Sequence, residues 1–259
     1  MKTRTLPSGA EMPIIGLGTW TLKGKDGTDA VATALELGYR HIDTALAYDN
    51  HRAVAAGIRR SGVPRDEIFV VSKVPRENLR YEEVLAAAEK SLEELDTDYL
   101  DLFLIHWPNP SIPMRETFTA LAEVRDKGWV RDIGVSNFDV GHLEEALEVT
   151  TVPIANDQVL YHPQRNQERL RQYCEERDIT VTSYSPLGKG EFTNERSLRR
   201  LGERHGRTPA QLILKWLIDK DVIVIPRSTS REHLAENLDI FGWELDDEAR
   251  QTLDSMEGS

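Results

Sequence analysis

The chain has 259 residues, enough for one α/β barrel of about 250 residues or for two small domains. Only 39% of the residues are hydrophobic and no apolar run approaches the roughly 20 residues needed to cross a bilayer, which excludes a membrane-spanning protein. The net charge of −12 argues against nucleic acids and anionic membranes as partners, and the single cysteine, Cys174, excludes an internal disulfide and favours a cytoplasmic location.

Strand patterns and helix patterns alternate along the first half of the chain. The first ten residues lack the apolar core of a signal peptide, and residues 2–12 are expected to form a β-hairpin that turns at Pro7–Gly9. Strands are predicted at 14–17, 40–42, 68–72 and 100–105. Each precedes a helix, predicted at 26–37, 50–60, 81–95 and 114–127.

The second half continues the same alternation, with strands predicted at 130–135, 154–159, 179–183 and 222–225. Helices are predicted at 139–149, 165–177, 195–205, 209–218 and 231–238, and Thr208 and Pro209 mark the start of the fourth. Eight strand–helix units without a linker predict a single (β/α)8 TIM barrel domain over residues 1–259, preceded by the hairpin. A doubly wound sheet is the alternative, but Gly16 and Gly18 lack the third glycine of its fingerprint.

Polar, titratable and aromatic residues stand at the predicted ends of all eight strands, where the chemistry of a barrel collects, and are scarce inside the strands. Each has a structural alternative: Asp43 and Lys73 as an ion pair, His106 as a core histidine, the tryptophans as packing. Their coincidence at one end of the barrel favours a functional role. The set, in chain order, is Gly18, Thr19, Trp20, Asp43, Tyr48, Lys73, His106, Trp107, Ser136, Asn137, Gln158, Tyr184, Ser185, Pro186, Leu187, Arg227 and Ser228.

These residue types allow a proton donor beside a carbonyl group. Tyrosine is a weak acid, so we expect Lys73, held by Asp43, to lower the pKa of Tyr48 and make it a useful donor. His106 can orient a carbonyl oxygen, and no spacing of His or Cys indicates a metal site. Because no side chain supplies a hydride, a bound nicotinamide is implied. Asn137 and Gln158 suit its carboxamide.

At the other strand ends, Tyr184 suits stacking on the nicotinamide ring. Arg227 and Ser228, just before the last predicted barrel helix, suit a phosphate group.

The motifs at these strand ends resemble those of the aldo-keto reductase family, and look most similar to its short prokaryotic members of the 2,5-diketo-gluconate reductase type. They extend from the first strand to the last: MPIIGLGTW (12–20), GYRHIDTA (38–45), LIHWP (104–108), GVSNF (134–138), DQVLYHP (157–163), SYSPLG (183–188) and IPRS (225–228).

The resemblance implies a monomeric barrel that reduces small aldehydes, ketones or keto-sugars with NADPH, or alternatively NADH. It implies the catalytic tetrad Asp43, Tyr48, Lys73 and His106, and a substrate site of Trp20, Tyr48, His106 and Trp107. The implied cofactor site comprises Gly18, Thr19, Trp20, Asp43, Ser136, Asn137, Gln158, Tyr184, Ser185, Pro186, Leu187, Arg227, Ser228, Thr229, His233, Glu236 and Asn237.

Several positions depart from the family pattern. Asp157 replaces the usual asparagine, Arg227 replaces a lysine, and His233 stands where an arginine for the 2′-phosphate is usual. Few residues follow Leu245, so we expect an open pocket without a long C-terminal loop. We expect this pocket to be apolar enough to favour aromatic and short aliphatic aldehydes over charged ones.

A barrel that binds the cofactor for regulation, with slow or no turnover, is the alternative function.

Overall fold

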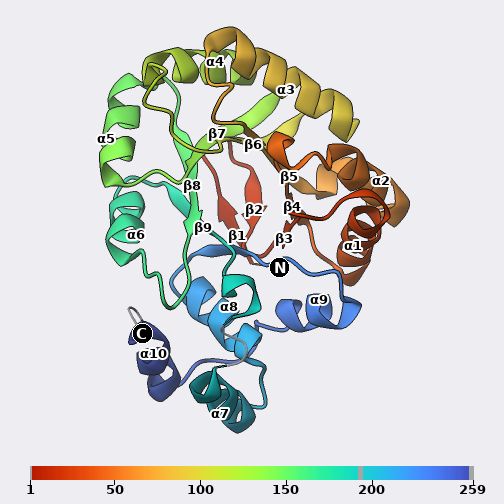
Figure 1. Ribbon diagram of the computed structural model, residues 1–259, viewed down its shortest axis with the longest axis vertical. Helices are drawn as coiled ribbons and strands as arrows, with labels where there is room; N and C mark the ends of the chain where they lie inside the picture. The colour runs from red at the N-terminus through yellow and green to blue at the C-terminus, as the bar shows by residue number, and fades with distance from the viewer. Residues whose placement is uncertain (1, 192–194, 257–259) are drawn as a thin grey trace.

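The computed structural model describes residues 2–191 and 195–256, and its strands form the centre of a ring of helices (Figure 1). An antiparallel hairpin of β1 (Thr3–Thr5) and β2 (Glu11–Pro13) comes first. The sheet that follows has eight parallel strands in chain order: β3 (Leu17–Gly18), β4 (His41–Asp43), β5 (Phe69–Val74), β6 (Leu100–Ile105), β7 (Val130–Ser136), β8 (Ile154–Leu160), β9 (Thr180–Tyr184) and β10 (Ile223–Ile225).

The sheet closes on itself between its first and last strands. Ile15 forms a parallel bridge with Val224, and the backbone N–H groups of Gly16 and Gly18 donate to the carbonyl oxygens of Val224 and Pro226. A Cβ atom on Gly18 would lie 2.6 Å from the Ile225 carbonyl oxygen, so this close approach requires glycine. The predicted TIM barrel with an N-terminal hairpin is therefore confirmed.

The helices cover the outside of the barrel in the order α1 (Gly24–Leu37), α2 (His51–Ser61), α3 (Tyr81–Leu95), α4 (Met114–Asp126), α5 (Val140–Val149), α6 (Glu168–Glu175), α8 (Pro209–Asp219) and α9 (Arg231–Leu238). Buried apolar residues of the strands and of the inner helix faces form one continuous core. A capping box between Thr208 and Gln211 starts α8 at Pro209, as the sequence predicts.

Two short helices, α7 (Arg196–His205) and α10 (Asp247–Asp254), lie outside the ring and pack on α8 (Figure 1). The sequence analysis missed α10, which is held to α8 by a hydrogen bond of 2.9 Å from the Trp216 indole to Asp254. Within the described ranges, no helix is both long and apolar enough to cross a membrane.

The hairpin covers the end of the barrel where the strands begin. The backbone N–H of Ser8, in its turn, donates to Asp132 near the start of β7 at 3.1 Å. The opposite end, where the strands finish, is therefore left for the loops that carry the predicted site residues.

The expectation that polar residues are scarce inside the strands is wrong. Asp101, Asp132, Asn156 and Asp157 are all buried within β6, β7 and β8. Asp101 shows the physical reason, because it ties neighbouring segments together: it accepts from the Val70 backbone and from two arginines on separate elements.

Candidate active site

The predicted tetrad comes together at the carboxyl end of the barrel. Asp43 is the last residue of β4, Lys73 lies near the end of β5, and His106 follows β6 directly. Tyr48 lies on a short 3-10 turn, Leu46–Tyr48, in the loop after β4. The rings of Tyr48 and His106 meet edge to face, with centroids 5.5 Å apart.

A buried ion pair lies beneath these rings. Lys73 Nζ is 2.6 Å from Asp43 Oδ1 and donates a second bond of 2.9 Å to the Thr44 carbonyl oxygen. Asp43 Oδ2 accepts from Gln158 Nε2 at 2.7 Å. Burial favours the neutral amine, but Asp43 and Tyr48 outweigh it and raise the pKa of Lys73, so that its ammonium stays charged.

Lys73 lowers the pKa of Tyr48, as predicted, but a second effect opposes it. Burial raises the pKa of Tyr48, and the Lys73 charge lowers it by less, so the net pKa lies above the usual value for tyrosine. The expectation of a lowered pKa is therefore wrong, because burial in the barrel mouth penalises the phenolate more than the ammonium, 5.2 Å from the ring centroid, stabilises it.

The environment of His106 disfavours a positive charge, whereas that of Lys73 favours one. Burial, followed by the charge of Lys73, lowers its pKa to about 3. The imidazole is therefore neutral in ordinary buffers and offers one N–H group to a neighbouring oxygen.

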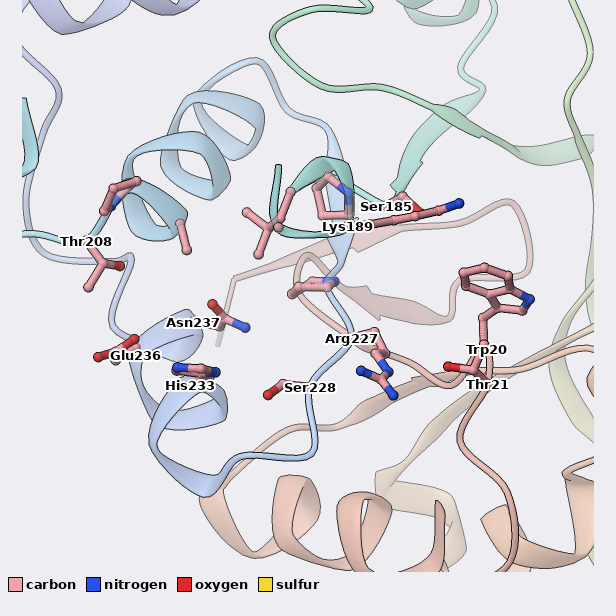
Figure 2. Close-up of a pocket in the computed structure, with 16 residues that line it drawn as sticks. Trp20, Thr21, Ser185, Lys189, Thr208, Arg227, Ser228, His233, Glu236 and Asn237 are labelled. Atoms are coloured by element: carbon pink, nitrogen blue, oxygen red, sulfur yellow. The ribbon is translucent and has the colours of Figure 1, made fainter. Parts of the chain in front are cut away.

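The side chains of Tyr48 and His106 open into a cavity of about 420 Å³, here called the inner cavity, whose walls include Trp20, Trp107 and Tyr184. A second hollow of about 610 Å³, the outer groove, extends from it toward α9. Trp20, Ser185, Lys189 and Arg227 line both, so the two spaces adjoin each other. Figure 2 shows the outer groove between Trp20 at one end and Thr208 at the other.

The polar groups at the base of the inner cavity fit an amide-bearing ring. Asn137 Nδ2 donates to the His106 carbonyl oxygen at 3.0 Å, and Asn137 Oδ1 accepts from the Tyr184 hydroxyl at 2.8 Å. Gln158 donates to Asp43, and its Oε1 accepts no hydrogen bond within the described part of the chain. Lone pairs on Asn137 and Gln158 thus remain for the NH2 of a carboxamide.

The outer groove collects most of the predicted cofactor residues. Its walls include Ser185, Pro186 and Leu187 after β9, Arg227 and Ser228 after β10, and His233, Glu236 and Asn237 on α9. Gly18, Thr19 and Ser136 line the inner cavity. Thr229 is exposed and lines neither space.

Strained backbone gathers around these spaces. Eight non-glycine residues in the described ranges have positive φ, and half of them line the two cavities: Thr21, Asn137, Ser185 and Lys189, with φ values of 69°, 62°, 49° and 58°. Such conformations persist only where the surroundings fix them, and they concentrate at functional sites.

The sequence analysis missed several wall residues. Lys189, Gly190 and the α8 start at Thr208–Ala210 line the outer groove. The sequence predicts Thr208 and Pro209 only as the start of a helix, and the structure shows that they also form part of the groove wall. Lys189 follows the SYSPLG motif directly, and its sequence neighbours carry no signal of where it points.

Asp157 stands at the position where the family resemblance predicts an asparagine, and it faces away from this site. It is fully buried, and neither carboxylate oxygen has a hydrogen-bond partner of ordinary geometry among the described residues. Burial raises its pKa well above the usual range, although the nearby Phe138 backbone N–H acts in the opposite direction. In those same ranges, no cluster of three His, Cys, Asp or Glu side chains could hold a metal ion.

Comparison with known proteins agrees with this site. The model of the aldo/keto reductase family matches residues 14–257. The chain belongs to this family. The glyoxal reductase of Bacillus subtilis (strain 168) is 42% identical over 255 residues, which cover 98% of this chain and 92% of that protein.

Two solved structures are also close. One is a mutant of the protein Gox0644 in complex with NADPH, with 38% identity, a TM-score of 0.92, and coverage of 98% of this chain and 93% of that one. The other is a putative 2,5-diketo-D-gluconic acid reductase B, with 36% identity, a TM-score of 0.94, and coverage of 99% and 92%. This aldo-keto reductase is therefore an oxidoreductase of carbonyl compounds.

Proposed function

We propose that this aldo-keto reductase converts aldehydes and ketones to alcohols, with NADPH as the electron source and Tyr48 as the proton donor. The observation that carries the proposal is the edge-to-face pair of Tyr48 and His106 above the buried Lys73–Asp43 ion pair. Both rings line the inner cavity, and the outer groove that adjoins it offers room for the rest of an extended nucleotide.

The side chains divide the work between them. NADPH, when bound, supplies the hydride to the carbonyl carbon. The neutral His106 donates a hydrogen bond that positions the carbonyl oxygen. As that oxygen gains the electron pair of the C=O bond it becomes a strong base, and it takes the proton from Tyr48 Oη. The Lys73 ammonium then stabilises the phenolate, and Asp43 keeps Lys73 charged.

The raised pKa of Tyr48 is compatible with this role. A phenol that resists ionisation stays protonated throughout the physiological range, so every enzyme molecule carries the proton. An alkoxide is a stronger base than a phenolate, so the transfer remains favourable once the hydride has moved.

The substrates follow from the walls of the inner cavity. Trp20 and Trp107, which are 49% and 46% exposed, give apolar surfaces at its mouth. The 42%-identical relative is a glyoxal reductase, so glyoxal and methylglyoxal are the first compounds to assay. A mostly apolar cavity with a few converging polar groups is typical of small-molecule sites, which fits substrates of this size.

The outer groove supports NADPH over NADH. Arg227 and His233 lie on its wall with Ser228 between them (Figure 2). Arginine pairs bidentately with phosphate, and Ser228 Oγ can add a hydrogen bond. We place the 2′-phosphate of NADPH against this group and the nicotinamide against Asn137, Gln158 and Tyr184.

The test is steady-state oxidation of NADPH with methylglyoxal by Tyr48→Phe. Loss of a general acid commonly costs about 10²–10⁴-fold in rate, so kcat should fall at least 100-fold while the Kd for NADPH stays constant. Tyr173→Phe, which removes a hydroxyl on α6 that lines neither cavity, is the matched control. A Tyr48→Phe enzyme with a tenth of the wild-type kcat would refute the assignment, and slow turnover by wild type with intact NADPH binding would favour the regulatory barrel.

A further inference from the structure

A third hollow, here called the lateral pocket, lies between α5 and α6, two neighbours in the ring of helices (Figure 1). Its volume is about 810 Å³. One wall is the start of α5, residues 139–144, and the other is residues 165–170, which lead into α6. It meets the inner cavity at Trp107, Asn137 and Tyr184, and it shares no residue with the outer groove.

We propose that the lateral pocket binds a small organic anion, a carboxylate or a phosphate ester with an apolar body, through Arg165 and Arg169. The pocket lies apart from the groove in which we place the nucleotide, and most of its wall comes from residues that the proposed reaction does not use. The inference therefore stands independently of the proposed function.

The two arginines of this pocket have no carboxylate partner. Arg165 and Arg169 are exposed, and neither forms a salt bridge within the ranges that the structure describes. The neighbouring acids Glu168 and Glu175 are both paired with Arg171, at 2.7 and 2.9 Å. In a chain with a net charge of −12, two guanidinium groups on one wall create a local positive region that attracts small anions. Arginine also pairs bidentately with carboxylates and phosphates.

The carboxylates of the pocket lie on the opposite wall. Asp139 is the N-cap of α5, and its Oδ1 accepts from the His142 backbone N–H at 2.9 Å and lies 2.7 Å from His142 Nδ1. Glu144 follows on the same helix and is exposed. An anion is therefore repelled by the α5 wall and attracted by the wall of Arg165 and Arg169. This separation of charge gives a bound anion one orientation.

Apolar side chains line the space between the two walls. Phe138, Val159 and Leu170 are buried and present apolar surface to the pocket. Burial raises the pKa of Tyr184, and the charge of Arg165 acts in the opposite direction, because this guanidinium lies near the Tyr184 ring. An organic anion can therefore place its charge at the arginines and its body on the apolar surface, whereas an inorganic ion gains only the charged contacts.

The experiment is calorimetric titration of the protein with phenyl phosphate, benzoate and inorganic phosphate. We expect phenyl phosphate or benzoate to bind more tightly than inorganic phosphate, and the comparison of the two tells which anionic group is preferred. The double variant Arg165→Gln/Arg169→Gln should weaken this binding about tenfold, because two exposed charged contacts are lost. Arg115→Gln is the matched control, since it removes an exposed arginine on α4 that lines none of the three hollows.

Gly141 allows the pocket to be blocked without loosening the fold. Among the described residues, the one atom near a Cβ built there is Asp139 Oδ1, at 3.5 Å, which is an ordinary contact. An acidic residue is also favourable in the first turn of a helix. Gly141→Glu should therefore abolish binding of the organic anion, by bulk and by charge, whereas Gly141→Ala should retain it.

Two results would overturn the inference. One is that neither phenyl phosphate nor benzoate binds more tightly than inorganic phosphate. The other is an affinity that stays the same in Gly141→Glu and in the double arginine variant. If saturating NADPH then displaced the anion, its site would be the outer groove and not the lateral pocket.

Discussion

Lys73 Nζ lies 2.6 Å from Asp43 Oδ1, and the two side chains are only 0% and 2% exposed. Removing one partner of a buried ion pair leaves an uncompensated charge, which costs about 3–5 kcal/mol. We therefore expect Lys73→Met to lower the free energy of unfolding by about 3 kcal/mol, measured by urea denaturation, and to abolish most activity.

The double variant Lys73→Met/Asp43→Asn separates stability from catalysis. With both charges removed, most of the lost stability should return, while kcat should stay low because no ammonium supports Tyr48. If activity returned together with stability, the pair would have no role beyond folding.

The pH dependence of kcat follows from two neighbouring side chains. The pKa of His106 is lowered to about 3, so His106 should gain no proton above about pH 4. The pKa of Tyr48 is raised, so Tyr48 should keep its proton up to at least about pH 10. We expect kcat to vary little between pH 5 and 9, provided that circular dichroism shows an intact fold. A fall in kcat at acidic pH, centred near the ordinary pKa of histidine, would show that burial and Lys73 do not lower the pKa of His106 as the structure indicates.

His233 provides a test of cofactor choice. It lines the outer groove together with Arg227. An arginine at this position would add a permanent cation with two parallel N–H donors for a phosphate. His233→Arg should therefore tighten the binding of NADPH several-fold and leave the binding of NADH, which lacks the 2′-phosphate, nearly unchanged, as measured by fluorescence quenching.

The matched control for this variant is His142→Arg, which makes the same change at a partly exposed site on α5. It should alter neither Kd. An equal change in the Kd values for NADPH and NADH in His233→Arg would show that residue 233 does not touch the phosphate.

Replacing the buried Asp157 should raise the free energy of unfolding. Its pKa is raised in the folded protein, so the folded state keeps a proton that the unfolded chain releases. Stability is therefore lost as pH rises from about 4, the value for an exposed aspartate, toward the folded pKa. Asp157→Asn removes this loss and should add about 1–3 kcal/mol at pH 7.5.

The same variant at pH 4.5 is its own control, because the carboxyl is then largely protonated in both states. Unfolding in urea should show a smaller gain there than at pH 7.5. An equal gain at both pH values would mean that the asparagine acts through packing and not through charge.

The sequence predicted the barrel, the hairpin and the meeting of Asp43, Tyr48, Lys73 and His106, because strand ends follow directly from the alternation of patterns. It could not predict the net pKa of Tyr48. Proximity of Lys73 is visible from the strand order, but the degree of burial that outweighs it depends on how the loops fold over the mouth. The assignment of cofactor contacts stays a prediction.

Two further features depend on tertiary contacts that no local pattern shows. Helix α10 is short, and its hydrogen bond from Trp216 to Asp254 joins residues 38 apart. The position of Lys189 depends on three successive left-handed residues, only two of which are glycines. From the sequence alone, both α10 and the segment around Lys189 are predicted to be loops.

The bridge between Ile15 and Val224 has a consequence for how the chain is made. The first barrel strand obtains its second neighbour only after more than two hundred further residues have been synthesised, so the ribosome must release nearly the whole chain before the ring can close. Until then both edges of the unfinished sheet can pair with other chains. We expect nascent chains stalled before Val222 to need a chaperone, and unprotected amide exchange at Gly16 and Gly18 in such chains would be the sign of the open edge.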